Sequence, residues 1–302
     1  NSINFILNFS ISFILTFTPI IHVDSVVGWI WLFYNGYDFE TNPLGINKPI
    51  LDKIQLMHSF ITEIKYADSC GMDFHKTGYA PYISSLIMFH NKEDYYFLGD
   101  KEQVVDVEKL QYGGFAPFEQ TLELTRCSDG PIAAWTTLKT IGINGYREII
   151  ANSLESTQYF RDKINALPFA EVVNANSNGV ATLFILKPEG FEDKALAEIL
   201  TMPKEETDKV KNYNLNFTRY VDELNEKGET HLAFTASDVF TVAGTNVCLG
   251  SIKAYPMSPH YTKENIDAIV ALIATLKERY DCDENWTFKT LHYIPADMVY
   301  RR

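Results

Sequence analysis

A lysine in the stretch GMDFHKTGYAP, residues 71–81, has neighbours that could give it a chemical role. Lys76 follows Asp73 and His75, so a carboxylate, an imidazole and an amine fall within four residues. A second carboxylate, Asp24, lies 52 positions before Lys76, at the end of the apolar run PIIHVD. A lysine amine can capture an aldehyde as a Schiff base, and a carboxylate can keep a heterocycle protonated. These residue types therefore indicate a site for an aldehyde cofactor.

Each of these residues also has an ordinary explanation. An aspartate at a strand end often caps a turn or helix, and a single lysine is usually a solvated charge. A cofactor of the pyridoxal phosphate type needs both groups together, because the lysine binds the aldehyde while the carboxylate holds a proton on the pyridine nitrogen. Asp24 and Lys76 could supply this pair only if the fold brings them together.

The segments around these residues have the pattern of an α/β domain. Residues 19–24 are a short run, rich in β-branched residues, that predicts a buried strand ending at a ligand site. Helical spacing of apolar residues predicts a helix over 49–66, and a second strand is expected over 82–90. The polar stretch 91–120 contains YGGFAP, whose glycines and proline predict a mobile loop.

Helices and strands alternate in a different way in the second half of the chain. We expect a helix over 130–142, ended by Gly142, and a longer helix over 144–167. After Pro168, AEVVNA, GVATLFIL and TNVCLGSIKAY predict strands, and a final helix follows Thr262, a good N-cap residue. This mixture predicts a smaller α+β domain.

The expected domains are a partial cofactor-binding large domain over 1–150 and a small C-terminal domain over 151–302. Within the first domain, residues 1–18 are an unassigned apolar leader. The chain carries no Lys, Arg, Asp or Glu before Asp24 and does not begin with Met. Its start is either a buried strand region or spurious leader, or a segment with a membrane or targeting role.

Composition excludes several classes of function. The 302 residues are 46% hydrophobic, which is enough for a sizeable core. With 26 basic and 39 acidic residues, the net charge of −13 disfavours nucleic acid and anionic lipid as partners. Four scattered cysteines predict reduced thiols in a cytoplasmic protein. No HxxxH, HExxH, GxGxxG or GxxxxGK motif is present, so neither a metal nor a nucleotide site is expected.

Four segments together resemble the pyridoxal phosphate-dependent group II amino-acid decarboxylases. HVDSVVGW (22–29), ADSCGMDFHKTGYAP (67–81) and TLELTRCSDGPIAAWTTLKTIGINGY (121–146) follow the order of that family's strand, lysine turn and helix entry. SIKAYPMSPHYTKENIDAIVALIATL (251–276) is similar to the closing strand and helix of bacterial tyrosine and glutamate decarboxylases. The resemblance implies part of a fold type I (aspartate aminotransferase-like) large domain with a mostly parallel sheet, followed by a smaller α+β domain.

The resemblance also implies roles for particular residues. Lys76 would hold pyridoxal 5'-phosphate as a Schiff base, Asp24 would pair with the ring nitrogen, and Val26 would lie against the ring face. Three further side chains would lie at or near the cofactor phosphate: Ser69, Asp73 and His75. The family's ring-stacking aromatic residue and its phosphate-binding loop would precede residue 19, where this chain has no match.

Two more residues would act on the substrate. Tyr112, in QYGGFAP, would be the loop tyrosine that protonates the carbanion left when carbon dioxide departs, with Tyr95 and Tyr96 as alternatives. Lys253 stands where the family commonly has an arginine that positions the substrate carboxylate. A lysine keeps the charge but loses the planar two-point contact, and it could instead be an ordinary exposed strand lysine.

The leading hypothesis is a homodimeric decarboxylase that acts on an amino acid and uses no metal. HKTGYAP and YGGFAP are also similar to the sphingosine-phosphate lyase branch, which breaks a carbon–carbon bond to release an aldehyde. Under that alternative the apolar start of the chain could be a membrane tether. A third possibility is a fragment that binds or scaffolds without catalysis.

Overall fold

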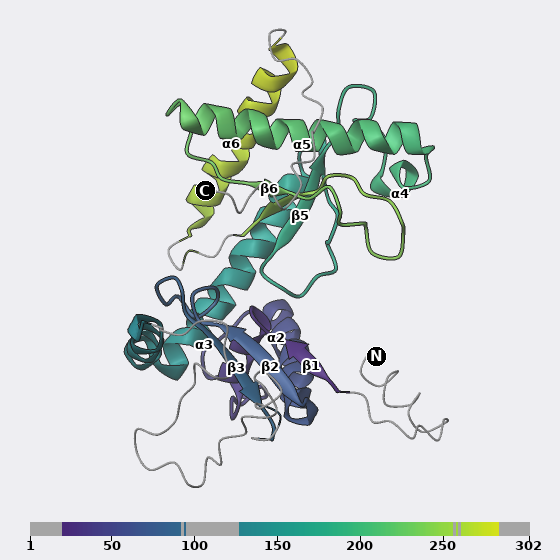
Figure 1. Ribbon diagram of the computed structural model, residues 1–302. Helices are drawn as coiled ribbons and strands as arrows, with labels where there is room; N and C mark the ends of the chain where they lie inside the picture. Colours follow the sequence, from purple (N-terminus) through teal and green to yellow (C-terminus); the bar gives the residue numbers. More distant parts are fainter. Residues whose placement is uncertain (1–19, 92–93, 95–126, 256–257, 259–260, 284–302) are drawn as a thin grey trace, which may run out of the picture. The chain divides into compact units, whose positions relative to one another are not determined.

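The structure is a computed structural model that describes part of the chain: residues 20–91, 94, 127–255, 258 and 261–283 (Figure 1). The chain divides into two compact units, Asn1–Glu148 and Ile149–Arg302. We call them unit 1 and unit 2 and describe each by itself.

Unit 1 contains a three-stranded sheet in the order β1-β2-β3. β1 (His22–Asp24) runs parallel to β2 (Ser69–Asp73), whereas β3 (Ser85–Phe89) runs antiparallel to β2. The described sheet is thus mixed, because only a short connection joins β2 to β3 and such a connection returns the chain in the antiparallel direction. The parallel pair places the carboxyl ends of β1 and β2 at the same edge.

Three helical segments connect β1 to β2. They are the 3-10 helix η1 (Gly28–Tyr34), the α-helix α2 (Lys48–Ile61) and the 3-10 helix η2 (Thr62–Tyr66). The helix expected over 49–66 is therefore present, but its last turn tightens after Ile61. η1 was not expected; it contacts α2 and buries two tryptophans, Trp29 and Trp31. Burying a large apolar side chain contributes about 1.5–3 kcal/mol, so η1 anchors the segment that follows β1.

The helix α3 (Asp129–Asn165) contains the boundary between the two units. Gly142 interrupts it with a φ of 67° and a ψ of 173°, values that lie outside the helical region. Glycine adopts a positive φ without the steric penalty of a Cβ atom. The predicted helix end at Gly142 is confirmed as a break between two helical segments.

Unit 2 contains a four-stranded sheet in the order β4-β5-β7-β6, with every pairing antiparallel. Its strands are β4 (Ala170–Val172), β5 (Thr182–Leu186), β6 (Thr235–Ala236) and β7 (Ile252–Ala254). The expected strands near AEVVNA, GVATLFIL and SIKAY are present. β6 was missed because two residues are too few to show a strand's alternating pattern.

Helices α4 (Leu196–Ile199), α5 (Lys204–Glu226) and α6 (Lys263–Cys282) complete unit 2. Figure 1 shows α5 lying across the sheet, where it contacts β5, β6 and β7. Phe184 of β5 and Phe217 of α5 are fully buried in the shared core. α6 begins with a capping box between Thr262 and Asn265, which confirms the predicted start of this helix.

The described part of the chain has neither a candidate membrane span nor a candidate metal cluster. None of its helices combines the length and the apolar character needed to cross a membrane. In the same residues, no group of three or more His, Cys, Asp or Glu side chains is placed to hold a metal ion.

Candidate functional site

The predicted lysine lies in a turn between β2 and β3, residues 74–84, which we call the lysine turn. Asp73, the last residue of β2, is only 9% exposed. Its Oδ2 lies 2.6 Å from Lys76 Nζ, and its Oδ1 accepts a hydrogen bond of 2.6 Å from Ser85 Oγ. Both carboxylate oxygens of Asp73 therefore have partners, and one partner is the amine that the sequence singled out.

The electrostatics of this pair favour the charged forms of both groups. The hydrogen bond to Asp73 is the main cause that raises the pKa of Lys76; burial opposes it, and the charges of Asp73 and Asp24 add to it. Burial alone would raise the pKa of Asp73, but hydrogen bonds from Lys76 and Ser85 and the nearby positive charge hold it below its usual range. Lys76 is thus protonated at neutral pH, with 41% of its side chain exposed.

His75 lies beside the same carboxylate with its side chain only 5% exposed. Its Nε2 is 3.7 Å from Asp73 Oδ2. Its Nδ1 is 2.8 Å from the carbonyl oxygen of Ser84, and its ring centroid is 4.1 Å from that of Tyr82. The imidazole is therefore held in place from both ends of the lysine turn.

Asp24 reaches this edge of the sheet from β1. Its register partner on β2 is Gly71, two residues before Asp73. Its Oδ1 accepts a hydrogen bond of 3.1 Å from the amide of Val26, and the residue is exposed. Its charge is one of the smaller causes that raise the pKa of Lys76, after the hydrogen bond and the charge of Asp73. Ligands of α/β sheets bind at such strand ends.

Val26 and Ser69 occupy different places relative to this edge. A Cβ atom built on Gly71 would lie 4.0 Å from Val26 Cγ1, so Val26 lies against β2 close to Asp24. Ser69 begins β2, about 13 Å from the other end of that strand at roughly 3.3 Å per residue. Its Oγ lies 2.8 Å from His22 Nδ1. The structure thus brings Val26, but not Ser69, to the edge where Asp24 lies.

Residues far apart in the chain hold the backbone of the lysine turn. Trp29 Nε1 donates to the carbonyl of Asp73 at 3.1 Å, and the Tyr146 hydroxyl donates to the carbonyl of Gly78 at 2.6 Å. Gly78 itself has no room for a side chain, since a Cβ atom would lie 2.6 Å from Phe74 O and 2.8 Å from Trp29 Cζ2. Trp29 and Tyr146 end two of the segments that carry the family resemblance, but sequence reasoning gave neither a role, because their carbonyl partners are 44 and 68 positions away in the chain.

A pocket of about 580 Å³ in unit 1 borders the lysine turn. Its lining includes Tyr82 and Ser84, which hold His75, and Ser85, which holds Asp73. The first turn of α3 forms another part of the lining. The side chains that position the buried imidazole and carboxylate are therefore next to open space.

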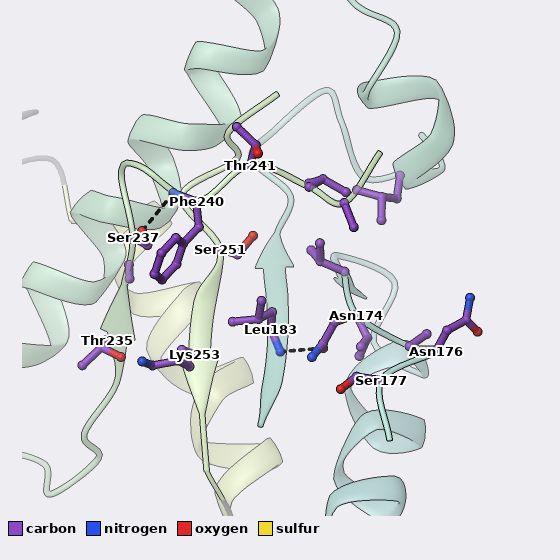
Figure 2. A pocket seen from close by; sticks show the side chains of 17 residues that line it. Asn174, Asn176, Ser177, Leu183, Thr235, Ser237, Phe240, Thr241, Ser251 and Lys253 are labelled. Carbon is purple, nitrogen blue, oxygen red and sulfur yellow. Dashed lines mark hydrogen bonds between the residues drawn. The ribbon is translucent and has the colours of Figure 1, made fainter. Parts of the chain in front are cut away.

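Lys253 belongs to unit 2, where it lies on β7 and lines a pocket of about 830 Å³ (Figure 2). Its Nζ is 5.2 Å from the ring centroid of Tyr255. The predicted loop tyrosine, Tyr112, and its alternatives Tyr95 and Tyr96 lie outside the described residues.

Curated proteins similar to this chain are amino-acid decarboxylases. The chain is 29% identical over 114 residues to a probable L-aspartate decarboxylase of Pyrococcus abyssi, a match that covers 38% of this chain and 28% of that protein. It is 27% identical over 139 residues to a probable L-tyrosine/L-aspartate decarboxylase of Methanococcus maripaludis, covering 46% and 33%. The matched segment is thus about a third or less of each relative. No family model matches the chain.

Solved structures with a similar fold include mouse CSAD and Oryza sativa TDC with PLP and tryptamine. The apo form of mouse CSAD matches with a TM-score of 0.56 and 16% identity, covering 84% of this chain and 45% of that one. The Oryza sativa structure matches with a TM-score of 0.55 and 14% identity, covering 87% and 45%. These likenesses confirm the expected fold, a partial fold type I large domain followed by a smaller α+β domain.

Proposed function

We propose that this chain, which is similar in sequence and fold to the group II pyridoxal phosphate-dependent decarboxylases, is part of an enzyme that decarboxylates an amino acid. One observation carries the proposal. The Lys76 amine is held 2.6 Å from Asp73 at the end of β2, while Asp24 ends the adjacent parallel strand at the same edge of the sheet.

The residues present fit pyridoxal 5'-phosphate in their chemistry. The half-exposed amine of Lys76 can reach an aldehyde, and the exposed carboxylate of Asp24 can accept a hydrogen bond from a protonated ring nitrogen. Val26 beside Asp24 offers an apolar surface for one ring face. When bound, the cofactor would accept the electron pair of the bond that carbon dioxide leaves.

Asp73 controls when the lysine can react. Only the neutral amine is a nucleophile, and the ion pair with Asp73 keeps Lys76 protonated. Lys76 must therefore give up a proton and leave Asp73 before it attaches to an aldehyde. His75 and Ser85 stay beside Asp73 and would hold the carboxylate in place during this exchange.

The substrate and the roles of the remaining residues extend the proposal. The relatives' names make L-aspartate and L-tyrosine the first candidate substrates. Lys253 would contact a substrate carboxylate, and Tyr112 would donate a proton to the product. We assign cofactor attachment to a large domain over 1–150 and the Lys253 contact to a small domain over 151–302.

We further propose a cytoplasmic homodimer. Large apolar side chains of unit 1 are exposed, among them Tyr82 at 79%, Ile83 at 72% and Trp135 at 64%. Exposed apolar side chains that gather on a surface mark places where another chain packs. The four free cysteines agree with a reducing compartment. Light scattering of the purified chain would test the dimer.

The test is covalent attachment of the cofactor. The purified chain is mixed with pyridoxal 5'-phosphate, reduced with borohydride and digested, and the modified peptide is identified by mass spectrometry. We expect modification at Lys76 and none in Lys76→Ala. Lys65→Ala is the control, because Lys65 is an exposed lysine paired with Glu63. Modification that persists in Lys76→Ala would refute the assignment.

Release of carbon dioxide from L-aspartate or L-tyrosine then tests the reaction itself. The relatives' names favour this reaction over the aldehyde-forming lyase reaction. Attachment without turnover of any amino acid would instead favour a chain that binds the cofactor without catalysis.

A further inference from the structure

The pocket of unit 2 is larger than a contact with one carboxylate requires. Its volume is about 830 Å³, and nine of the seventeen residues around it are apolar. Lys253 is the one charged residue among the described residues that line it, and none of these carries a carboxylate. The charge of Lys253 attracts an anion, and the apolar lining residues suit a ligand that also has an apolar group.

Lys253 is available to hold the anion. It lies on β7 between Leu183 of β5 and Thr235 of β6, its register partners. None of the described carboxylates forms an ion pair with it. Its ammonium contacts the ring of Tyr255 at 5.2 Å, and an ammonium has three protons to donate, so an oxygen acceptor can bind as well.

Phe240 provides the apolar contact. Phe240 is 60% exposed, although it lines the pocket. Ser237 Oγ accepts a hydrogen bond of 3.1 Å from the amide of Phe240, which fixes the backbone while the ring remains uncovered. Figure 2 shows this ring on the same side of the pocket as Thr235 and Lys253. A ligand that covered the ring would remove exposed aromatic surface from water.

The opposite wall of the pocket is already formed. Arg161, 2% exposed, donates hydrogen bonds to the carbonyls of Ser177 at 2.7 Å, Gly179 at 3.1 Å and Ala181 at 2.7 Å. Asn174, on the same wall, accepts a hydrogen bond of 2.8 Å from the amide of Leu183. A wall that is held in this way need not be ordered when a ligand binds, which favours affinity.

We propose that this pocket binds a small carboxylate that carries an aromatic or similarly flat apolar group, with Lys253 holding the carboxylate and Phe240 packing on the apolar group. Phe240 is therefore the residue that sets ligand selectivity. The ligand class follows from residues of unit 2 alone, whereas its extension to an apolar or aromatic amino-acid substrate rests on the proposed function.

The test compares 3-phenylpropanoate, a carboxylate with an aromatic ring, with succinate, a carboxylate without one. Phenethylamine, which has the ring and a positive charge, is the third ligand. Each is titrated into the full chain by ligand-observed nuclear magnetic resonance. We expect 3-phenylpropanoate to bind about tenfold more tightly than succinate, because it buries a ring. Phenethylamine is expected not to bind. Tighter binding of succinate or of the amine would overturn the proposal.

Variants separate the two contacts. Phe240→Ala should weaken 3-phenylpropanoate about tenfold and leave succinate unchanged. Val239→Ala is the matched control, because Val239 is 72% exposed on the same loop but does not line the pocket. Lys253→Met should weaken both carboxylates about tenfold. Equal effects of Phe240→Ala and Val239→Ala would refute the role of the ring.

A further variant keeps this test independent of the cofactor. Lys76→Ala should lose cofactor attachment and bind 3-phenylpropanoate as the unsubstituted chain does. If the unsubstituted chain bound 3-phenylpropanoate but did not attach pyridoxal 5'-phosphate, the result would count only against the proposed function. If the unsubstituted chain attached the cofactor but did not prefer 3-phenylpropanoate to succinate, the result would count only against the ligand class proposed for this pocket.

Discussion

Lys76 in unit 1 and Lys253 in unit 2 have the same side chain in opposite surroundings. The amine of Lys76 lies 2.6 Å from a buried carboxylate whose second oxygen is held by Ser85. Lys253 has no ion-pair partner among the described carboxylates and lines a pocket of hydroxyl, amide and apolar groups. The positive charge of Lys76 is balanced by Asp73, whereas the positive charge of Lys253 is available to a ligand.

This difference separates two uses of a lysine. A lysine that must react as a neutral amine benefits from a nearby group that can exchange its proton. A lysine that must bind an anion benefits from surroundings without a competing carboxylate.

The largest effect is expected when the two lysines are removed in turn. Lys76→Ala should abolish covalent attachment of pyridoxal 5'-phosphate and retain carboxylate binding, whereas Lys253→Ala should do the reverse. Borohydride reduction with mass spectrometry measures the first property, and ligand titration measures the second. If one substitution removed both properties, the two lysines would not have separate roles.

Arg161→Met should lower the free energy of unfolding by about 3 kcal/mol. The substitution removes one buried donor from the carbonyls of Ser177, Gly179 and Ala181, of which Ala181 keeps a hydrogen bond from Asn174, and each such loss costs about 1–3 kcal/mol with incomplete additivity. Urea denaturation measures the change. Arg279→Met is the control, because Arg279 is exposed in its pair with Glu229 and should cost less than about 1 kcal/mol. Equal costs would show that the pocket wall does not depend on Arg161.

Gly78→Ala should destabilise unit 1 by about 1–3 kcal/mol, because the new Cβ atom would overlap Phe74 O and Trp29 Cζ2. Gly244→Ala, next to the pocket residue Ala243 of unit 2, should cost only about 1 kcal/mol. Gly244 has open space around it, and only its φ of 80° disfavours alanine. Denaturation curves of the two variants would contradict the tight packing of the lysine turn if Gly244→Ala were the more costly change.

The smallest effect concerns pH. The raised pKa of Lys76 means that its proton is lost only as the pH rises through that raised value, so attachment to an aldehyde should accelerate with pH. Asp73→Asn removes the main cause of the raised pKa and should move this acceleration to lower pH. The rate of absorbance change after mixing with pyridoxal 5'-phosphate, measured across a pH series, gives the midpoint. Ser85→Ala should move it less, and an unchanged midpoint in Asp73→Asn would contradict the ion pair.

Much of the candidate site was predictable because its signals are local. A β-branched run ending in Asp24, a turn containing Lys76 and the rule that ligands bind at strand ends together predicted their proximity. The cap at Thr262 and the break at Gly142 were also predictable, since both depend on one residue type and its nearest neighbours. The roles assigned to these site residues stay predictions.

Other features could not be predicted from local patterns. The 3-10 helix η1 and the short strand β6 carry too little periodicity to be recognised. The roles of Trp29, Tyr146 and Arg161 were not predictable, because each acts through hydrogen bonds to backbone carbonyls that come near only after the chain has packed. Ser69 lies at the other end of β2 from Asp73, and its role near the cofactor phosphate stays a prediction.

The order of residues along the chain was enough to show which chemistry is available: a lysine amine beside an acid and a histidine, a second acid at a strand end, and a later lysine on a strand. The pairing of Lys76 with Asp73, and the place of Lys253 in a large pocket lined by Phe240, became visible only in the folded chain. Residue type and spacing determine local conformation, whereas the charge state and availability of a lysine depend on groups that packing brings within a few ångströms.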